Sequence, residues 1–311
     1  MKNNRYIFTV TGECDGLRLD KAASELAGAY FSRTYIKKLI SEEQILLNGV
    51  PRKASWSVKE GDSIDMMAPE AKEPDILPED IPLDILYEDD DVIVVNKPKG
   101  MVVHPAAGHN SGTLVNALMY HCGESLSGIN GVLRPGIVHR IDKDTSGSII
   151  ACKNDAAHAV IAEQLKDHSL NRTYRAIVCG IIPEDELTVD APIGRHPTDR
   201  KRMAVNRAGK EAITHVTIIK RLEEYGLTYI ECRLKTGRTH QIRVHMESLG
   251  FPLLGDEVYY RGRKPSNSFK KTDTAGQALH AYMLGFKHPS DGRYVETMAP
   301  IPEYMGRIVG E

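Results

Sequence analysis

A segment rich in proline and acidic residues divides this chain of 311 residues and limits how it can fold. Residues 69–91 contain four prolines, ten acidic residues and a single base, Lys72. Proline lacks an amide hydrogen and like charges repel, so such a segment favours an extended connection over a helix or strand. The chain is also longer than one ordinary domain. We therefore expect two folded units, residues 1–68 and 84–311, joined by a linker at 69–83.

Setting this acidic segment aside changes the charge balance of the chain. The whole sequence has 40 lysines and arginines against 42 acidic residues, which gives a formal net charge of -2. Outside residues 69–91 the counts are 39 basic and 32 acidic residues, so the remainder carries a charge of +7. A chain with this distribution can present a basic face to a polyanion such as a nucleic acid.

Simple patterns exclude several classes of protein. No run approaches the roughly 18 apolar residues of a membrane span, and the first residues lack the apolar centre of a secretory signal, so we expect a cytoplasmic protein. The five cysteines are dispersed and include no Cys-x-x-Cys pair, which argues against a disulfide framework or a zinc–cysteine site. The polar, charged composition contains no evident interface stripe, so we expect a monomer.

The segment before the linker shows two helical patterns and a hairpin. Apolar residues recur at helical spacing in residues 17–27 and 33–42. The apolar run that follows contains Asn48-Gly49, a pair that favours a tight two-residue turn. We therefore expect a small helix-helix-hairpin domain with its core in residues 17–68.

The segment after the linker contains more strand patterns than helical ones. β-Branched and aromatic residues dominate these strands, and strands do not alternate with helices as they do in doubly wound folds. We therefore expect an α+β domain with a mixed, mainly antiparallel β-sheet flanked by helices and loops. Strands are expected at 92–95, 148–151, 174–178 and 228–232, and helices at 113–121, 156–167 and 239–249.

The densest group of polar residues lies immediately before the strand pattern at 148–151. Residues 136–147 read Gly-Ile-Val-His-Arg-Ile-Asp-Lys-Asp-Thr-Ser-Gly and form a loop that a scaffold can hold rigidly. A solvated surface turn is the simplest interpretation of such a loop. His139 with Asp142 or Asp144 would suit a hydrolase relay, but the chain has no Gly-x-Ser-x-Gly nucleophile motif. Residue patterns alone leave these interpretations open.

Within this loop, residues 139–147 resemble the signature of the RluA-type pseudouridine synthases, His-Arg-Leu-Asp-x-x-Thr-Ser-Gly, with Ile141 in place of the leucine. Three further stretches agree with this family, in order along the chain. They are 95–105 (Val-Asn-Lys-Pro-Lys-Gly-Met-Val-Val-His-Pro), 172–176 (Arg-Thr-Tyr-Arg-Ala) and 234–245 (Leu-Lys-Thr-Gly-Arg-Thr-His-Gln-Ile-Arg-Val-His). The resemblance covers about residues 84–300, and residues 17–68 are similar to the small RNA-binding domain first described in ribosomal small-subunit protein four. The two domains in this order resemble the RluD branch, which acts on large-subunit ribosomal RNA.

This resemblance implies an isomerase that detaches uracil from its ribose in RNA, turns the base and rejoins it through carbon, without a cofactor or metal. Asp142 matches the family's catalytic aspartate, which acts either as a nucleophile on the sugar or base or as a base at the ribose. Arg243 matches the arginine that pairs with this aspartate and keeps it ionised. Tyr174 matches the tyrosine that packs on the extruded uracil and assists proton removal from carbon 5. Arg140 matches the position that contacts RNA near the flipped nucleotide.

Further cations are expected to contact RNA. Basic residues crowd the stretch 195–210, which is an ordinary solvated face or, given the resemblance, a clamp on phosphates. The histidines at 104, 139, 240 and 245 lack metal-binding spacing, so no metal is expected. The expected RNA contacts are Lys97 and His139 near the signature loop, Arg195, Arg200, Lys201 and Arg202 in the basic stretch, and Arg33, Lys37, Lys38, Arg52 and Lys53 in the first domain.

The sequence therefore predicts a pseudouridine synthase that acts on ribosomal RNA or on the assembling large subunit. A transfer-RNA enzyme of the same family is one alternative, and a catalytically silent RNA-binding or ribosome-assembly factor is another. The joint presence of Asp142, Tyr174 and Arg243 argues against a silent factor. The N-terminal RNA-binding domain argues for the ribosomal substrate, by analogy.

Overall fold

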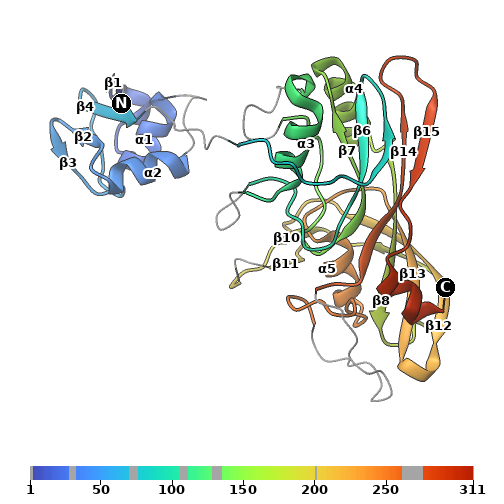
Figure 1. The fold of residues 1–311 in the computed structure, drawn as a ribbon. Coiled ribbons are helices and arrows are strands. Elements are labelled where there is room, and N and C mark those ends of the chain that lie inside the picture. Colours follow the sequence, from blue (N-terminus) through green and yellow to red (C-terminus); the bar gives the residue numbers. More distant parts are fainter. Residues whose placement is uncertain are drawn as a thin grey trace. The chain divides into compact units, whose positions relative to one another are not determined.

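A computed structural model describes residues 3–27, 33–69, 76–105, 111–127, 135–199, 202–260 and 276–310 (Figure 1). The chain divides into two compact units, Met1–Asp75 and Ile76–Glu311. Each unit has a hydrophobic core of its own. Within the described ranges, no helix is long and apolar enough to cross a membrane.

The first unit consists of two helices packed against a small sheet. The helix α1 (Leu19–Leu26) buries Leu19, Ala22 and Ala23, which lie three or four positions apart and therefore on one face of the helix. The turn at Asn48-Gly49 has positive φ angles of 50° and 76°, as a type I′ hairpin turn requires. The sheet has four antiparallel strands in the order β1-β4-β2-β3, two more than the predicted hairpin. Its elements are β1 (Asn3–Thr9), η1 (Gly12–Cys14), α1 (Leu19–Leu26), α2 (Arg33–Ser41), β2 (Ile45–Leu47), β3 (Val50–Pro51) and β4 (Ser63–Pro69).

The second unit is organised around a nine-stranded mixed sheet with the order β5-β6-β7-β14-β8-β13-β12-β9, in which β15 also pairs with β14. The strand β14 is parallel to β7, and the other neighbouring strands are antiparallel. The strands of this sheet are β5 (Ile85–Glu88), β6 (Val92–Lys97), β7 (Ser146–Cys152), β8 (Asn171–Cys179), β9 (Glu186–Asp190), β12 (Ile213–Leu222), β13 (Leu227–Leu234), β14 (Leu279–Lys287) and β15 (Tyr294–Met298). A separate hairpin is formed by β10 (Ile193–Arg195) and β11 (Met203–Val205). The helices are α3 (Leu114–Cys122), η3 (Gly123–Ser125), α4 (Asp155–Lys166), η4 (Glu223–Tyr225), α5 (Gln241–Ser248) and α6 (Glu303–Val309).

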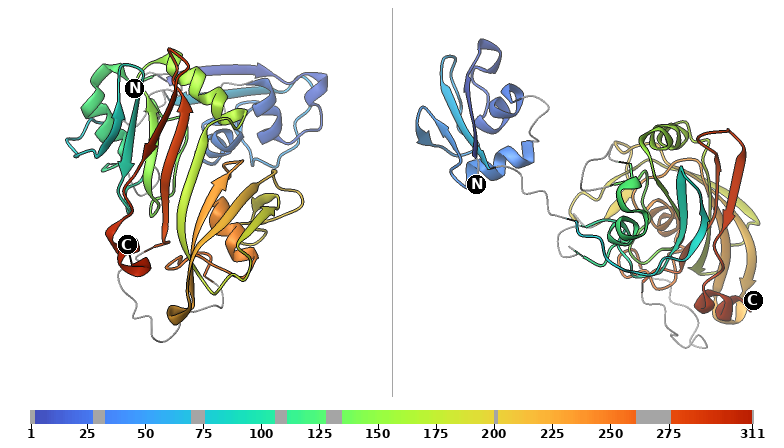
Figure 2. Two further views of the ribbon diagram at one scale, coloured as in Figure 1. Left: turned by 90° about the vertical axis from the view of Figure 1, so that its right-hand side faces the viewer. Right: turned by 45° about the horizontal axis from the view of Figure 1, so that its top comes forward.

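Helices cover both faces of the nine-stranded sheet. In β6, Ile93 and Val95 belong to a core that includes α3 and α5, whereas Val92 and Val94 belong to a second core that includes α4. The C-terminal helix α6 packs through Met305 against β8 and β13. The ribbon views show α3 and α5 on the same side of the sheet (Figure 1) and α6 on the opposite side (Figure 2). Because both faces are covered, β6 and β7 are buried along nearly their whole length rather than at alternate residues.

The predicted fold class and the predicted elements of the second unit are confirmed. The four expected strands are β6, β7, β8 and β13, and the three expected helices are α3, α4 and α5. The sequence patterns do not anticipate β9, β12, β14 or β15. The strand β14 contains leucine, alanine and methionine, which favour helices, and it becomes a strand through its pairing with β7 and β8.

The linker expected at residues 69–83 stays a prediction. Residues 70–75 lie outside the described part of the chain. The residues that follow contact the second unit, because Ile76 is buried in its core and the side-chain amide of Asn116 in α3 donates to the carbonyl oxygen of Leu77 at 2.8 Å. The last part of the proline-rich segment is therefore packed against the unit that it precedes.

The loop before β7 is anchored at the middle of the sheet. Gly147 has a φ angle of 107°, and a Cβ atom at this position would lie 2.3 Å from the carbonyl oxygen of Ala281 in β14. Only glycine fits such a close approach of two backbones. His280 and Ala281 pair in parallel with Ser146 and Gly147. The sheet thus fixes the point at which the signature loop ends.

Candidate active site

Asp142 lies in the loop that leads into β7, and hydrogen bonds hold this loop in shape. The backbone N–H of Thr145 donates to the carbonyl oxygen of Asp142 at 3.1 Å, which closes a turn. The side-chain amide of Gln277 donates to the hydroxyl of Thr145 at 3.1 Å, and both side chains are buried. The Asp142 side chain is 18% exposed, so its carboxylate can be reached from solvent while its backbone is fixed.

Lys97 joins the same loop to the end of β6. It is fully buried, and its Nζ donates to the carbonyl oxygens of Pro98, Met101 and Lys143 at 2.9, 2.8 and 3.0 Å. Burial lowers the pKa of Lys97 to about 7, and the negative charges of nearby carboxylates oppose this shift. Because its donors are directed at backbone oxygens, Lys97 links the Asp142 loop to the end of β6, and its ammonium group is shielded from solvent.

Arg243 in α5 joins two carboxylates. Its Nη1 donates to Oδ2 of Asp142 at 2.8 Å, and its Nε and Nη2 donate to Asp256 at 2.7 and 2.9 Å. Asp256 is buried and also accepts the backbone N–H groups of Val258 and Tyr259, each at 3.0 Å. Burial alone would lower the pKa of Arg243, but the hydrogen bonds and charges of Asp256 and Asp142 raise it above its usual value. Arg243 is therefore a fixed cation, held by one carboxylate and bonded to the other.

The start of α5 is held by a side-chain amide and an unusual backbone. The buried Gln241 accepts from the hydroxyl of Thr236 at 2.8 Å and from the N–H of Arg238 at 3.0 Å, and it donates to the carbonyl oxygen of Ile213 at 2.9 Å. His240, which precedes the helix, has a φ angle of 57°. This left-handed conformation is energetically unfavourable for every residue except glycine. This conformation places His240 Nε2 at 3.7 Å from Oδ1 of Asp142.

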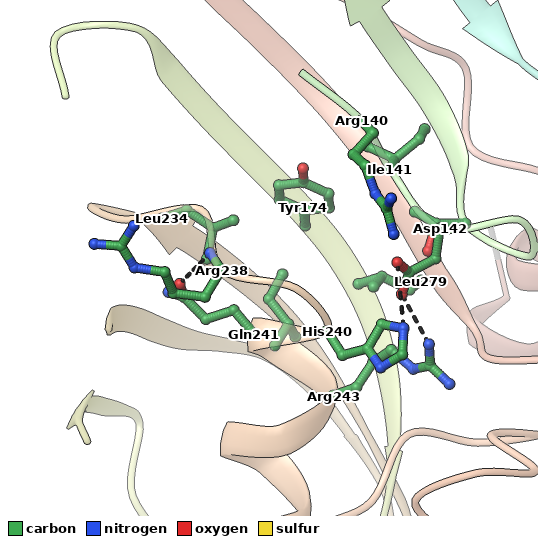
Figure 3. A pocket seen from close by; sticks show the side chains of 12 residues that line it. Arg140, Ile141, Asp142, Tyr174, Leu234, Arg238, His240, Gln241, Arg243 and Leu279 are labelled. Carbon is green, nitrogen blue, oxygen red and sulfur yellow. Dashed lines mark hydrogen bonds and ion pairs between the residues drawn. The ribbon is translucent and has the colours of Figure 1, made fainter. Parts of the chain in front are cut away.

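A cavity lies between the Asp142 loop, α5, β8 and β14. Asp142, His240 and Arg243 converge at one side of it, and Tyr174 from β8 and Leu279 from β14 complete the wall (Figure 3). Apolar side chains, among them those of Ile141, Leu234 and Ile242, form much of the remaining lining. The cavity therefore combines apolar walls with one carboxylate, Asp142, and three arginines, Arg140, Arg238 and Arg243, a composition suited to a flat, uncharged ring attached to a polyanion.

A second cavity, of about 320 Å³, shares five lining residues with the first, including Arg140 and Asp142. Its other walls include His104, Lys143 and Gln277. Asp142 therefore lines both cavities, and a ligand larger than one ring can occupy both of them and contact its carboxylate.

Burial keeps the phenol of Tyr174 and the imidazole of His240 uncharged. Burial raises the pKa of Tyr174, the Arg172 cation opposes this shift, and the Asp142 charge adds to it. Burial likewise lowers the pKa of His240, although the Asp142 carboxylate acts in the opposite direction. The pKa shifts of both groups therefore favour the neutral phenol and the neutral imidazole.

Arg140 and His139, two of the RNA contacts expected near the signature loop, differ in their surroundings. Arg140 is exposed and lines both cavities. His139 accepts the backbone N–H of Ile150 through Nε2 at 3.2 Å, and burial together with the Arg172 cation lowers its pKa to about 3. His139 is therefore a neutral part of the loop scaffold, whereas Arg140 is available to a ligand.

The described part of the basic stretch overlaps the strands β10 and β11, and its cations also differ in exposure. Arg195 is exposed at the end of β10. Arg202 is only 6% exposed, and it pairs with Glu247 of α5 at 3.3 Å. The interior position of Arg202 suits a structural role better than a phosphate contact. The expected contacts at Arg200 and Lys201 lie outside the described residues.

In the first unit, four of the expected RNA-binding cations are exposed, namely Lys37, Lys38, Arg52 and Lys53. Lys37, Arg52 and Lys53 line one shallow cavity between α2 and the hairpin. The fifth, Arg33, begins α2, and its side chain lies outside the described part of the structure. The helix and the hairpin thus bring cations that are far apart in sequence to one surface.

Within the described part of the chain, one group of side chains has the spacing of a metal site. Asp89, Asp91 and His288 bring one possible ligand atom each within 4.8 Å of one another. These atoms already have protein partners: His288 Nε2 lies 2.6 Å from Asp89, and the hydroxyl of Ser290 bonds to Asp91. None of the three residues lines a cavity that contains Asp142.

Sequence reasoning does not identify Asp256 or Tyr259, and it considers His240 only as a metal ligand. Asp256 follows Gly255, and this pair indicates a turn. Nothing in it identifies Asp256 as a partner for Arg243. The signal that could have drawn attention to Asp256 is its charge next to the apolar residues Leu253 and Leu254, since a charge within an apolar segment needs a partner.

Comparison with solved structures supports the fold. The human RNA pseudouridylate synthase domain containing 1 matches with a TM-score of 0.57 over 77% of this chain and 89% of that chain, at 24% sequence identity. The human RNA pseudouridylate synthase domain containing 4 matches with a TM-score of 0.56 over 73% of this chain and 91% of that chain, at 21% identity. At these identities the likeness concerns the fold alone.

Sequence comparisons extend over nearly the whole chain. The chain is 49% identical to the uncharacterized RNA pseudouridine synthase YlyB of Bacillus subtilis, over 98% of this chain and 97% of that protein. It is 48% identical to the ribosomal large subunit pseudouridine synthase D of Zymomonas mobilis, over 96% of this chain and 94% of that protein. Residues 17–64 match the S4 domain, and residues 91–248 match the family model of RNA pseudouridylate synthases. With the aspartate, arginine and tyrosine gathered in one cavity, the chain belongs to the RNA pseudouridylate synthase family and is an isomerase that acts on RNA.

Proposed function

We propose that this chain isomerises uridines of large-subunit ribosomal RNA in the cytoplasm, with Asp142 as the catalytic residue. The observation that carries the proposal is the Asp142 carboxylate, bonded to Arg243 at 2.8 Å and placed at the wall of an apolar cavity. Arg243 holds Oδ2 of this carboxylate and leaves Oδ1 free for the substrate.

The reaction needs little more than this carboxylate. The bond between N1 of uracil and C1′ of ribose breaks, a bond between C5 and C1′ forms, a proton leaves C5, and N1 gains a proton, so that substrate and product are isomers. No water is added, so the second carboxylate that glycosidases use to activate water is not required. Asp142 supplies the reacting oxygen, as a nucleophile or as the base at the ribose.

The cavity receives the uracil only after the nucleotide has left the RNA stack, at a cost of a few kcal/mol. Tyr174 offers an aromatic face for stacking, and Ile141, Leu234 and Leu279 supply apolar contacts. Arg140, exposed between the two cavities, is suited to contact the RNA beside the flipped nucleotide. Because burial raises the pKa of Tyr174, its hydroxyl is a neutral group that can relay the C5 proton through a hydrogen bond.

Two features support the large-subunit RNA as the substrate. Several relatives that match most of the chain carry the name ribosomal large subunit pseudouridine synthase D, including those of Zymomonas mobilis and Pasteurella multocida. The first unit matches the S4 domain and exposes Lys37, Arg52 and Lys53 around one cavity, which suits a phosphate backbone. A transfer-RNA substrate and a silent assembly factor are the alternatives that an experiment has to separate.

The test compares Asp142→Asn with Asp144→Asn, two near-isosteric changes in one loop. Pseudouridines are mapped across all RNA of cells that lack the protein and of cells that carry the wild type or either variant. We expect sites in large-subunit RNA to disappear without the protein, to stay absent with Asp142→Asn and to return with Asp144→Asn. RNA affinity of the purified Asp142→Asn protein should remain within a few-fold of the wild type, because only the reactive charge is lost.

Each alternative gives a different pattern. Loss of pseudouridine from transfer RNA alone identifies the transfer-RNA enzyme. Full modification with Asp142→Asn contradicts the catalytic assignment, and equal loss from both variants indicates that Asp142 and Asp144 act as a pair.

A further inference from the structure

Tyr259 contacts both the β10–β11 hairpin and His240, the residue before α5. It follows α5 in sequence and is fully buried. Its phenol oxygen lies 2.7 Å from the backbone nitrogen of Met203, the first residue of β11, and 2.8 Å from Nδ1 of His240. One oxygen atom therefore connects the β10–β11 hairpin to a side chain that faces Asp142.

The proton positions in this arrangement follow from counting donors. The backbone N–H of Met203 can only donate, so the phenol oxygen accepts it. Burial raises the pKa of Tyr259, so the phenol keeps its own proton, which is then directed at Nδ1 of His240. Because burial also keeps His240 neutral, its single ring proton resides on Nε2, the atom that lies 3.7 Å from Oδ1 of Asp142.

The ring of Tyr259 contacts the second side chain that faces Asp142. Its centroid lies 4.9 Å from the guanidinium carbon of Arg243, which bonds to Asp142, and 5.2 Å from that of Arg202 on the hairpin. The ring also packs edge-on against His240, at 5.5 Å between centroids. Both groups on the Asp142 carboxylate, the imidazole and the guanidinium, therefore rest against one tyrosine.

We infer that Tyr259 is a positioning residue that couples the β10–β11 hairpin to the catalytic carboxylate through His240. Its hydroxyl holds the imidazole in the Nε2–H form, so that this N–H points at Asp142. A distance of 3.7 Å exceeds a hydrogen bond, and a shift of about 0.7 Å would complete one. Catalytic hydrogen bonds are often long in the free protein and shorten when substrate enters.

Two contacts link the β10–β11 hairpin to the residues around Asp142. Arg202 pairs with Glu247 of α5, and the N–H of Met203 is bound by Tyr259, while Arg195 at the end of β10 is exposed. RNA that displaces or presses on the hairpin would move the acceptor of Met203 and with it the imidazole. The inference rests on the proposed role of Asp142, and the first part of its test does not need RNA.

The first measurement is the protonation of His240 by ¹⁵N NMR of histidine-labelled full-length protein near neutral pH. The signal is identified by its absence in His240→Ala. In the wild type we expect the proton on Nε2, and in Tyr259→Phe we expect a mixture of both ring forms. The groups that face His240 are Asp142, Arg243, Asp256, Arg140 and Tyr259, and only the last is changed.

The second measurement is the single-turnover rate of pseudouridine formation on an unmodified transcript of large-subunit ribosomal RNA. Tyr259→Phe keeps the ring and loses the hydroxyl, so we expect the rate to fall about tenfold while RNA affinity changes less than about twofold. In a protein that already carries His240→Ala, adding Tyr259→Phe should have almost no further effect, because the two residues act in series. Tyr260→Phe is the matched control, since its hydroxyl bonds to Cys179 and not to the site. Urea unfolding of each variant shows that it is folded.

The outcomes separate the inference from the proposed function. A wild-type proton on Nδ1, or equal rates for Tyr259→Phe and the wild type, overturns the role of Tyr259. Rate losses of Tyr259→Phe and His240→Ala that multiply show that Tyr259 does not act through His240. If the wild type leaves the ribosomal transcript unmodified, the proposed substrate is wrong, and the NMR result still decides the position of the His240 proton.

Discussion

Asp256→Asn tests whether the position of Arg243 depends on its buried partner. The carboxylate of Asp256 accepts four N–H groups: Oδ1 binds Arg243 Nη2 and the backbone N–H groups of Val258 and Tyr259, and Oδ2 binds Arg243 Nε. An asparagine whose oxygen takes the Oδ1 position keeps three of these contacts. Its amide group then faces Arg243 Nε, so that two donors meet where a charge-assisted hydrogen bond was.

The expected magnitude follows from this replacement. One charge-assisted hydrogen bond contributes about 1.5–3 kcal/mol, and breaking a buried ion pair costs about 3–5 kcal/mol. Asp142 still neutralises part of the Arg243 charge, so we expect a loss of about 2–4 kcal/mol in the free energy of unfolding. If Arg243 turns away from the amide, Asp142 loses its 2.8 Å contact, and the rate should fall by about 10- to 100-fold.

The assay combines urea unfolding with single-turnover pseudouridine formation at a temperature where the variant is folded. Asp185→Asn is the matched control, because Asp185 also pairs with an arginine, Arg221 at 2.7 Å, but its side chain is 87% exposed. Exposed pairs contribute about 0–1 kcal/mol, so this control should change neither quantity appreciably. Wild-type stability and rate in Asp256→Asn would show that Arg243 holds Asp142 without help from Asp256.

Four further outcomes are expected. Arg243→Lys should lose most activity although it keeps the charge, because an ammonium cannot hold two carboxylates with the fixed geometry of a guanidinium; rates that match the wild type would contradict this. Tyr174→Phe should preserve RNA binding and slow the step that removes the C5 proton, measured by tritium release from labelled uridine, and an unchanged release rate would leave the hydroxyl without a chemical role. Burial lowers the pKa of His280 to about 4, whereas an unfolded histidine titrates near 6.5, so between these pH values the unfolded state binds more protons than the folded state. The free energy of unfolding should therefore fall by about 1.4 kcal/mol for each unit by which the pH is lowered from 6.5 to 4. His280→Gln should make this pH dependence shallower, as measured by urea unfolding at several pH values. Removal of residues 1–75 should leave a folded second unit whose RNA affinity is weaker and less dependent on salt, by about 0.7–0.9 in slope for each lost phosphate contact, and an unchanged slope would show that the first unit does not bind the backbone.

Local patterns were sufficient to predict most elements of the second unit, whereas the candidate site residues came from a resemblance between motifs. The apolar run of β6 and the helical spacing of α3, α4 and α5 are patterns among residues a few positions apart. Secondary structure depends largely on residues at this separation, so these patterns predict it. The motif residues Asp142, Tyr174 and Arg243 were identified through a resemblance, and all three line one cavity. The glycine at position 147 was part of that motif, and the close approach of Ala281 explains why no side chain fits there.

Contacts between distant segments account for what the patterns missed. Asp142 and Arg243 are 101 positions apart, and the partner that holds Arg243 is Asp256, which reads in the sequence as an ordinary turn residue. Lys97 and Arg202 read as surface cations and are buried, because burial depends on which strands and helices become neighbours. A buried charge or donor must find a partner within a few ångströms in the interior, and the order of strands, with β14 between β7 and β8, selects that partner. No local pattern contains this order, so the network of Asp256, Tyr259 and His240 around the Asp142 carboxylate exists only in the folded chain.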